Sequence, residues 1–265
     1  MFQRRKKILL GIDLEEFDLP EEYGQKIDME SKIMVSKDGL QNLLPILDRY
    51  HISITFFTTA FWAKHQPEIV LKLSADHEIA SHTYYHNSFQ KEDLQLSRIA
   101  LSKISGTEVR GLRMPKMKMI SPADIQHAGY EYDSSLNPIY IPGRYNHLGA
   151  KKQVYKTGGI YEMPISVSTP FRIPLFWLSF KNLPLSLYLS LCNNTLHNTG
   201  CLILYFHPWE FTDLKSFKIP GYIKRFSGTK MLERIDLLLN SLTQEGEFVT
   251  HGSFLESLEA TEKWT

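Results

Sequence analysis

Short apolar runs alternate along the chain with segments whose apolar residues recur every three or four positions. The runs have the residue types of buried strands, and the periodic segments have the spacing of one helix face. The predicted strands are residues 8–12, 52–58, 77–81, 111–113, 130–132, 161–165, 201–206 and 248–250. The predicted helices are residues 39–50, 67–74, 91–104, 122–128 and 229–242. This alternation is typical of β-α units built around a parallel sheet.

Seven or eight such units in one chain fit a (β/α) barrel of the α/β class better than an open sheet. Glycine, proline and charged residues are spread evenly and no linker is evident, so we expect a single domain over residues 1–265. Residues 137–156 and 169–184 follow neither pattern. They are expected to form loops that shape the mouth of a cleft.

Composition narrows the class of partner. Of the 265 residues 43% are apolar, enough for a large core, and 30 Lys and Arg against 29 Asp and Glu give a net charge of +1. That balance removes the electrostatic case for nucleic acid and favours a near-neutral substrate. Cys192 and Cys201 lack the spacing of a zinc or redox motif, so we expect two buried thiols. Nothing in the sequence indicates an oligomeric state.

The sequence also bears on location. A basic run at residues 4–7 is followed by too few apolar residues for the core of a signal peptide. The apolar stretch at residues 173–191 is interrupted by Pro174, Lys181, Asn182 and Pro184, which argues against a transmembrane helix. We therefore expect a cytoplasmic protein, with a peripheral contact to the inner face of the membrane through this stretch left open.

Polar side chains that could take part in catalysis or metal binding follow the predicted strands. In a barrel of parallel strands the carboxyl ends meet at one face, where catalytic groups are placed. The residues at or just after these strand ends are Asp13, Glu15, His82, His86, Arg113, Asp133 and His207. A random scatter would leave most such residues on helix exteriors, so this recurrence indicates a shared site.

His82 and His86 are four residues apart, a spacing that lets two imidazoles approach one cation. Neutral imidazole suits Zn, Co, Ni or Fe, although a bare pair at this spacing is more often two neighbours on a helix. Asp13 and Glu15 follow a buried strand, and period-two alternation puts them on the same side. For Glu16 and Asp18 a surface acidic loop is the simpler interpretation.

Two further residues end predicted strands. His207 closes the most apolar strand and is followed at once by proline; a core histidine is an equally good interpretation of it alone. Arg113 would need a carboxylate partner if buried, and Asp13 is the obvious candidate. The alternative for Arg113 is a surface arginine.

Taken in order, these motifs resemble those of a known family. An acidic strand end, His82-Thr83-Tyr84-Tyr85-His86, an R-x-P at residues 113–115, Y-D-S-S at 132–135 and His-Pro at 207–208 resemble the NodB-homology polysaccharide deacetylases, carbohydrate esterase family 4. The likeness runs over residues 8–211 and is closest to the branch whose first motif reads D-x-E, associated with cell-surface polysaccharide and peptidoglycan-type substrates. It implies a distorted (β/α)7 barrel.

The resemblance also implies roles. Asp13 would be the general base, oriented and kept ionised by Arg113, and His207 would be the general acid. Asp133, with Ser134, would line the cleft or support a catalytic side chain. Metal ligation falls to Glu15, His82 and His86. The second acidic residue of the family's first motif is usually Asp and here is Glu15, so Glu16 stays open as a rival ligand.

These roles predict a metal-dependent hydrolase that removes N-acetyl groups from an amino sugar in a polysaccharide, a peptidoglycan-type glycan or a glycolipid precursor. The metal is expected to be Zn, with Co, Ni or Fe as alternatives. Tyr84, Tyr85, Trp177 and Trp209 offer flat faces for sugar rings, or are ordinary core residues. Two other functions remain open: a non-catalytic glycan-binding barrel, and a hydrolase of O-acetyl or other amide groups.

Overall fold

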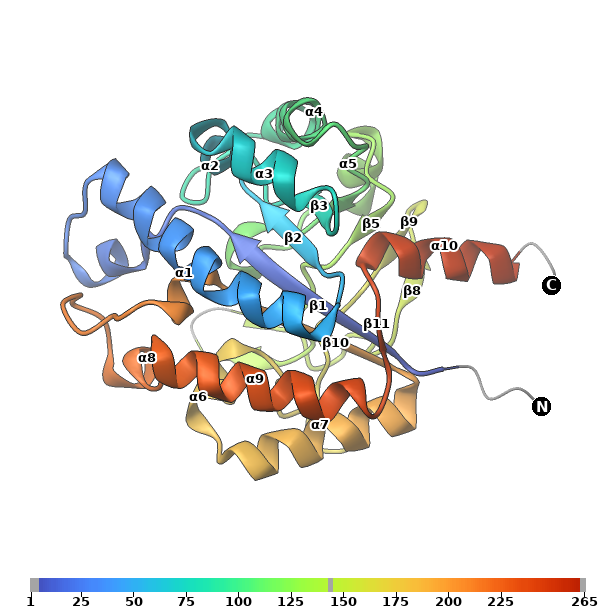
Figure 1. The fold of residues 1–265 in the computed structure, drawn as a ribbon. Helices are drawn as coiled ribbons and strands as arrows, with labels where there is room; N and C mark the ends of the chain where they lie inside the picture. The colour runs from blue at the N-terminus through green and yellow to red at the C-terminus, as the bar shows by residue number, and fades with distance from the viewer. Residues whose placement is uncertain (1–4, 143–144, 263–265) are drawn as a thin grey trace.

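The computed structural model describes residues 5–142 and 145–262, in which one curled sheet is surrounded by helices (Figure 1). Within these residues the sheet order is β10-β1-β2-β3-β4-β5-β9-β8, and β11 pairs with the start of β1. All neighbouring strands are parallel except β8 and β9. The strands are β1 (Lys7–Leu14), β2 (Thr55–Thr58), β3 (Glu78–Ser81), β4 (Gly111–Leu112), β5 (Tyr132–Asp133), β8 (Tyr155–Thr157), β9 (Ile160–Glu162), β10 (Cys201–Phe206) and β11 (Glu247–Phe248).

The chain that follows β9 brings the two ends of the sheet together. The Ser166 N–H donates to the Ile203 carbonyl at 3.0 Å, and the Ile203 N–H donates to the Ser166 Oγ at 2.8 Å. Because Ile203 lies in β10, these bonds close the curl between the first and last parallel strands. The predicted α/β class and distorted (β/α)7 barrel are confirmed.

Helices cover the outside of the sheet (Figure 1). They are α1 (Met29–Tyr50), α2 (Ala60–His65), α3 (Pro67–Leu73), α4 (Asp93–Ser105), α5 (Pro122–His127), α6 (Trp177–Asn182), α7 (Leu185–Thr199), α8 (Gly221–Lys224), α9 (Thr229–Thr243) and α10 (His251–Glu262). Short 3-10 turns are η1 (Leu19–Tyr23), η2 (Pro115–Met117) and η3 (Pro208–Phe211). None of the helices in the described part of the chain has the length and apolarity that a bilayer span requires.

Alternation along β1 separates the two sides of the barrel wall. Ile8, Leu10, Ile12 and Leu14 join the large core beneath the helices, whereas Leu9 belongs to a separate cluster. Residues of one parity in a strand share a face, so Asp13 points to the same side as Leu9, into the barrel. A single strand thus carries both the core and the first site residue.

Several element predictions need correction. The helix predicted at 39–50 begins ten residues earlier, at Met29, where the Asp28 side chain accepts the Ser31 N–H at 2.8 Å and caps it. The 169–184 stretch contains α6, and 137–156 contains the hairpin β6 (Tyr140–Ile141) and β7 (Tyr145–Asn146). Helices α2, α7 and α10 were not predicted, and residues 249–250 lead into α10 instead of continuing a strand. The Asp28 cap and the β6–β7 hairpin are local features, and the apolar pattern missed them because neither is an apolar periodicity.

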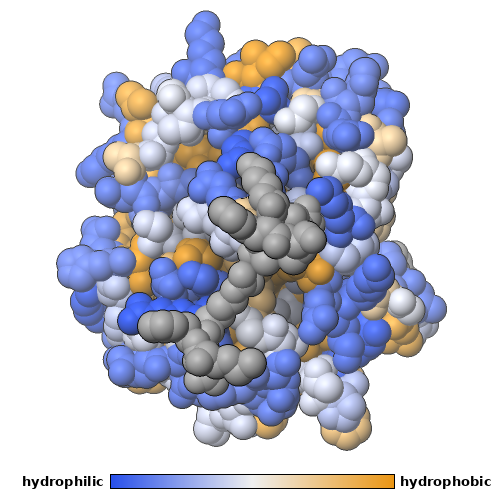
Figure 2. Space-filling model, turned by 90° about the vertical axis from the view of Figure 1, so that its right-hand side faces the viewer, coloured by the Kyte–Doolittle hydropathy of each residue, from blue (hydrophilic) through white to orange (hydrophobic). Residues whose placement is uncertain are grey.

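The remaining surface and thiol observations agree with a folded globular chain. Cys192 is buried and Cys201 half-buried, and both are free thiols, so one of the two predicted buried thiols is only partly covered. The face that carries the chain termini, opposite the carboxyl ends of the strands, is mostly hydrophilic where it is visible (Figure 2).

Gly39 sets how closely α1 approaches the turn after β10. A Cβ at this position would lie 1.8 Å from the Pro208 carbonyl oxygen, closer than two non-bonded atoms can come. Glycine inside a helix costs about 1 kcal/mol relative to alanine, so its presence here follows from the close contact and not from helix propensity. The contact fixes the turn that carries His207.

Replacing Gly39 by alanine should therefore destabilise the protein in spite of the better helix former. We expect Gly39→Ala to lower the free energy of unfolding by about 1 to 3 kcal/mol, the usual range for overpacking, in urea denaturation. Gly221→Ala is the matched control, because a Cβ there meets nothing within 4 Å. Equal stability of both variants would contradict the proposed contact.

Candidate metal and active site

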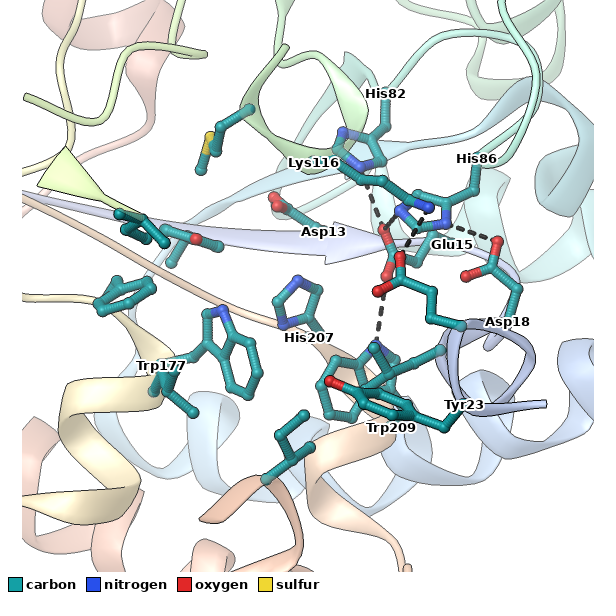
Figure 3. A pocket seen from close by; sticks show the side chains of 18 of the residues that line it. Asp13, Glu15, Asp18, Tyr23, His82, His86, Lys116, Trp177, His207 and Trp209 are labelled. Carbon is teal, nitrogen blue, oxygen red and sulfur yellow. Dashed lines mark hydrogen bonds and ion pairs between the residues drawn. The ribbon is translucent and has the colours of Figure 1, made fainter. Parts of the chain in front are cut away.

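A pocket opens at the carboxyl ends of the parallel strands, and five of the seven predicted polar residues line it (Figure 3). Asp13 and Glu15 come from β1 and the residue after it, His82 and His86 follow β3, and His207 follows β10. The pocket is lined by Asp13, Glu15, Asp18, Leu19, Glu22, Tyr23, His82, His86, Lys116, Met117, Ile141, Phe176, Trp177, Leu178, Tyr205, His207, Trp209, Tyr222 and Ile223.

Glu15, His82 and His86 form the one cluster of potential metal ligands found among the described residues, with ligand atoms all within 4.8 Å of one another. The Nε2 atoms of both histidines lie close to a single oxygen, Glu15 Oε2, at 3.1 Å and 3.0 Å. Glu16 is elsewhere: its carboxylate accepts a hydrogen bond from the Thr59 hydroxyl at 2.6 Å. The geometry therefore favours Glu15 over Glu16 as the third donor.

The outer nitrogen of each imidazole has its own partner. His82 Nδ1 lies 2.7 Å from the Arg113 carbonyl, and His86 Nδ1 lies 2.7 Å from Asp18 Oδ2. A carbonyl or carboxylate can only accept, so each Nδ1 carries a proton and each Nε2 is directed at the cluster. Such outer partners are the usual support of metal-binding histidines.

The charges within the cluster stabilise one another. Burial opposes ionisation of Glu15, but the charge of His86 and the hydrogen bond from His82 outweigh it and lower the pKa of Glu15 to about 2. Burial likewise opposes charging of His86, yet Glu15 and Asp18 raise its pKa to about 9. Without a metal ion, a proton on His86 thus supplies the positive charge beside Glu15. Binding of a metal ion would displace that proton.

Asp13 is held by a fully buried arginine. Arg113 Nη1 donates to Asp13 Oδ1 at 2.7 Å, while its other nitrogens donate to the carbonyl and hydroxyl of Ser134. The guanidinium stacks on the Phe57 ring with 3.9 Å between its carbon and the ring centroid. Such an arrangement orients the Asp13 carboxylate, which lines the pocket.

His207 has a carboxylate partner three residues further along. Glu210 Oε1 accepts the His207 backbone N–H at 2.9 Å and lies 3.1 Å from His207 Nδ1. Burial lowers the pKa of His207, but Glu210, Glu15 and Asp13 outweigh it, so the net shift is upward. The raised pKa favours the protonated form of a group that lines the pocket.

Asp133 occupies a different position from the other predicted residues. It is 1% exposed and is not among the residues that line the pocket. Its carboxyl group accepts a hydrogen bond from Ser135, and burial raises its pKa to about 6. Burial and the Asp133 charge also raise the pKa of Glu162 well above its ordinary value. Asp133 is thus buried outside the pocket lining, where the Arg113 charge partly offsets the effect of burial on its pKa.

Three residues support the site through contacts that the sequence did not predict. Asp18, interpreted above as part of a surface loop, is 4% exposed and supports His86. Glu210 supports His207, and the Trp209 indole N–H donates to Glu15 Oε1 at 3.2 Å. The acidic cluster and the H-P-W-E run were visible signals, but nothing in their spacing separated these partners from surface residues.

Of the four aromatic residues predicted to contact a sugar, two line the pocket and two do not. Trp177 and Trp209 line the pocket, and their rings contact each other and the His207 ring. The Tyr84 and Tyr85 rings contact each other at an interplanar angle of 51° and are not among the lining residues.

Comparison with known proteins finds two family models that match parts of the chain. Residues 33–132 match the family model described as polysaccharide deacetylase, and residues 134–256 match a domain of unknown function, DUF3473. No curated protein matches the sequence. The resemblance to the polysaccharide deacetylases that the sequence motifs predicted is therefore confirmed by the family model over residues 33–132, and the DUF3473 match follows it.

Solved structures share the fold at low sequence identity. A protein of Mycobacterium smegmatis assigned to the polysaccharide deacetylases has a TM-score of 0.67 at 18% identity, covering 99% of this chain and 93% of that one. The PuuE allantoinase has a TM-score of 0.66 at 14% identity, covering 100% and 94%. BA3943 of Bacillus anthracis, a pseudoenzyme of carbohydrate esterase family 4, has a TM-score of 0.53 at 11% identity, covering 94% and 65%.

The support of His86 by Asp18 can be tested without a substrate. We expect Asp18→Asn to weaken Zn²⁺ binding by about 10- to 100-fold, the usual cost of losing such an outer partner, in competition with a chromophoric chelator. Glu16→Gln removes a neighbouring carboxylate that bonds Thr59, and should change the affinity little. A comparable loss in both variants would mean that general negative charge, and not the Asp18 contact, matters.

Proposed function

We propose that this chain is a metal-dependent hydrolase that removes N-acetyl groups from an amino sugar. The observation that carries the proposal is the convergence of Glu15, His82 and His86 in the pocket that also holds Asp13 and His207. Two imidazoles and one carboxylate match the donor set of catalytic zinc sites, and both imidazoles are already turned to present Nε2. The residues therefore fit a divalent ion.

The chemistry divides among the pocket residues. A divalent ion held by Glu15, His82 and His86 would lower the pKa of a water molecule and polarise the acetyl carbonyl. Asp13, oriented by Arg113, would accept the proton of the attacking water. His207, as an imidazolium whose Nδ1 proton is held by Glu210, would donate the proton of its other ring nitrogen to the departing nitrogen. Such proton transfer contributes about 10² to 10⁴ in rate.

The lining supports a sugar as the substrate. Trp177 and Trp209 lie in the pocket beside His207 (Figure 3), and Tyr23 and Tyr222 also line it. Flat aromatic faces suit the apolar faces of sugar rings, and the acidic and basic groups beside them suit polar substituents. We propose an N-acetylated polysaccharide, peptidoglycan-type glycan or glycolipid precursor as substrate, and zinc as the metal.

We also propose that residues 1–265 form one domain, although two family models meet near residue 133. The strands β1 to β4 precede that point, β5 spans it and β9 to β11 follow it, yet all pair within the same sheet. His82 of the first matched region and His207 of the second therefore line one pocket.

The function is tested by acetate release together with metal analysis. The Zn²⁺-loaded protein should release acetate from N-acetylglucosamine oligosaccharides, and chelation should abolish this. His82→Ala should lose the metal and the activity together. His207→Gln should keep the metal while kcat falls by about 10² to 10⁴, the usual contribution of a general acid. His127→Ala, which changes an exposed histidine, is the control.

Other outcomes separate the alternatives. Release of acetate only from O-acetylated sugars, or opening of a cyclic amide, would contradict N-deacetylation while keeping the metal site. Binding of the oligosaccharide that is insensitive to chelation, with no metal taken up after reconstitution, would indicate a glycan-binding barrel. Unchanged activity in both His82→Ala and His207→Gln would overturn the assigned roles.

A further inference from the structure

Helix α6 delivers two side chains to the neighbourhood of His207. Trp177, at its start, lines the pocket and meets the His207 ring edge-on, with 5.3 Å between ring centroids (Figure 3). Lys181, one turn later, points away from the pocket and into the protein, where its side chain is 0% exposed. The helix thus has one side chain on the pocket side of His207 and one behind it.

Among the described residues, the buried amine of Lys181 forms an ion pair with Glu210 alone. Its Nζ lies 3.6 Å from Glu210 Oε2, and 5.7 Å from the centroid of the Trp209 ring. Neither Lys181 Nζ nor Glu210 Oε2 has a hydrogen-bond partner among the described residues. Burying two charged groups costs several kcal/mol each, and a pair this sparsely bonded recovers little of that cost. Stability therefore gives no account of why the pair is there.

The two oxygens of Glu210 face different partners. Oε2 faces Lys181, whereas Oε1 accepts the His207 backbone N–H and contacts His207 Nδ1. The carboxylate consequently lies between the ammonium and the imidazole, in the order Lys181, Glu210, His207. Only the last of the three lines the pocket.

We propose that Lys181 is a positioning residue that makes His207 a stronger acid, acting through Glu210. The inference rests on the proposed function, in which His207 gives a proton to the leaving nitrogen. Lys181 itself touches neither the pocket nor a reacting atom. It acts by neutralising the charge of Glu210, which contacts the His207 ring.

The argument follows the charge before and after the proton leaves. With His207 protonated, the imidazolium and Glu210 balance each other without any help. Once His207 is neutral, Glu210 would be an isolated buried anion, which is strongly disfavoured. A Lys181 ammonium 3.6 Å away neutralises it in that state. Lys181 thus stabilises the state that follows proton donation more than the one that precedes it.

Other charged and titratable groups face this chain of residues. Asp13 and Glu15 of the β1 end raise the pKa of His207, and Tyr205 of β10 lies edge-on to its ring. Burial lowers the pKa of Lys181, and Glu210 opposes that shift. Arg234 of α9 donates to the Phe180 and Leu183 carbonyls on either side of Lys181. Burial raises the pKa of Tyr188, and the Glu210 charge adds to that shift. None of these contacts replaces the ammonium at Glu210 Oε2.

The test is an NMR titration of the His207 ring in the full chain loaded with Zn²⁺, with ¹⁵N-labelled histidine and the signal assigned by its loss in His207→Gln. Lys181→Met should raise the pKa of His207 by about 1 to 2, and Glu210→Gln should lower it by about 1 to 3, the range for a nearby charge. In the Glu210→Gln background, Lys181→Met should have a much smaller effect. Opposite shifts from two partners of one ion pair would not arise from loss of packing.

Control variants separate charge from structure. Lys32→Met removes another mostly buried lysine, paired with Glu21 at 2.8 Å, and should leave the His207 titration unchanged. Lys181→Arg keeps the charge and should keep the pKa near that of the unchanged chain. Lys181→Gln is the second neutral variant if Lys181→Met does not fold. A His207 pKa that is unchanged or lowered in the folded neutral variant overturns the proposal.

Kinetics give the second readout. Because His207 must be protonated to act, the alkaline limb of the kcat profile should move to higher pH in Lys181→Met, while kcat on the plateau falls. The titration needs no substrate. Opposite pKa shifts without acetate release would therefore refute the proposed function alone, whereas acetate release with an unmoved titration would refute the role of Lys181 alone.

Discussion

The buried ion pair between Arg113 and Asp13 is the interaction on which the site depends. A guanidinium with no exposure must satisfy its donors inside the barrel, and it does so with Asp13 and with the carbonyl and hydroxyl of Ser134. Gly11 makes room for it, since a Cβ there would lie 2.5 Å from Arg113 Nη1. The backbone carbonyl of the same arginine accepts the His82 Nδ1–H. One residue thus orients the proposed base and one proposed metal ligand, so a shift of β4 would disturb both.

A second group of contacts holds the proposed acid. The turn after β10 is pressed against α1 at Gly39, and it places His207 and Glu210 within one short 3-10 turn. Helix α6 packs beside that turn with Trp177 and Lys181. The base and metal side is therefore built from β1, β3 and β4, whereas the acid side is built from β10, α6 and α1. The two sides meet because β1 pairs directly with β10, with Ile12 opposite Phe206.

The sequence was most informative where the local pattern is strong. The run at residues 201–206 is the observed β10, and the predicted strands 8–12 and 77–81 differ from β1 and β3 by only one or two residues at an end. The sequence was least informative in segments whose structure depends on distant partners. Helix α6 is six residues long and opens without a side-chain cap, so no local signal marks it; Arg234 of α9 holds the carbonyls near its end. The first ten residues of α1 were missed because their apolar positions are sparse.

For the site, the sequence by itself determined which residues end the strands, because strand alternation and the convergence of carboxyl ends follow from backbone geometry. That was enough to bring Asp13, Glu15, His82, His86 and His207 to one pocket. Only the tertiary structure decided that Glu16 bonds Thr59, that Asp18 and Glu210 are buried partners of histidines, and that Asp133 is buried outside the pocket lining. The reason is physical: a hydrogen bond depends on distances of a few tenths of an ångström between segments far apart in the chain, and no local pattern encodes such distances.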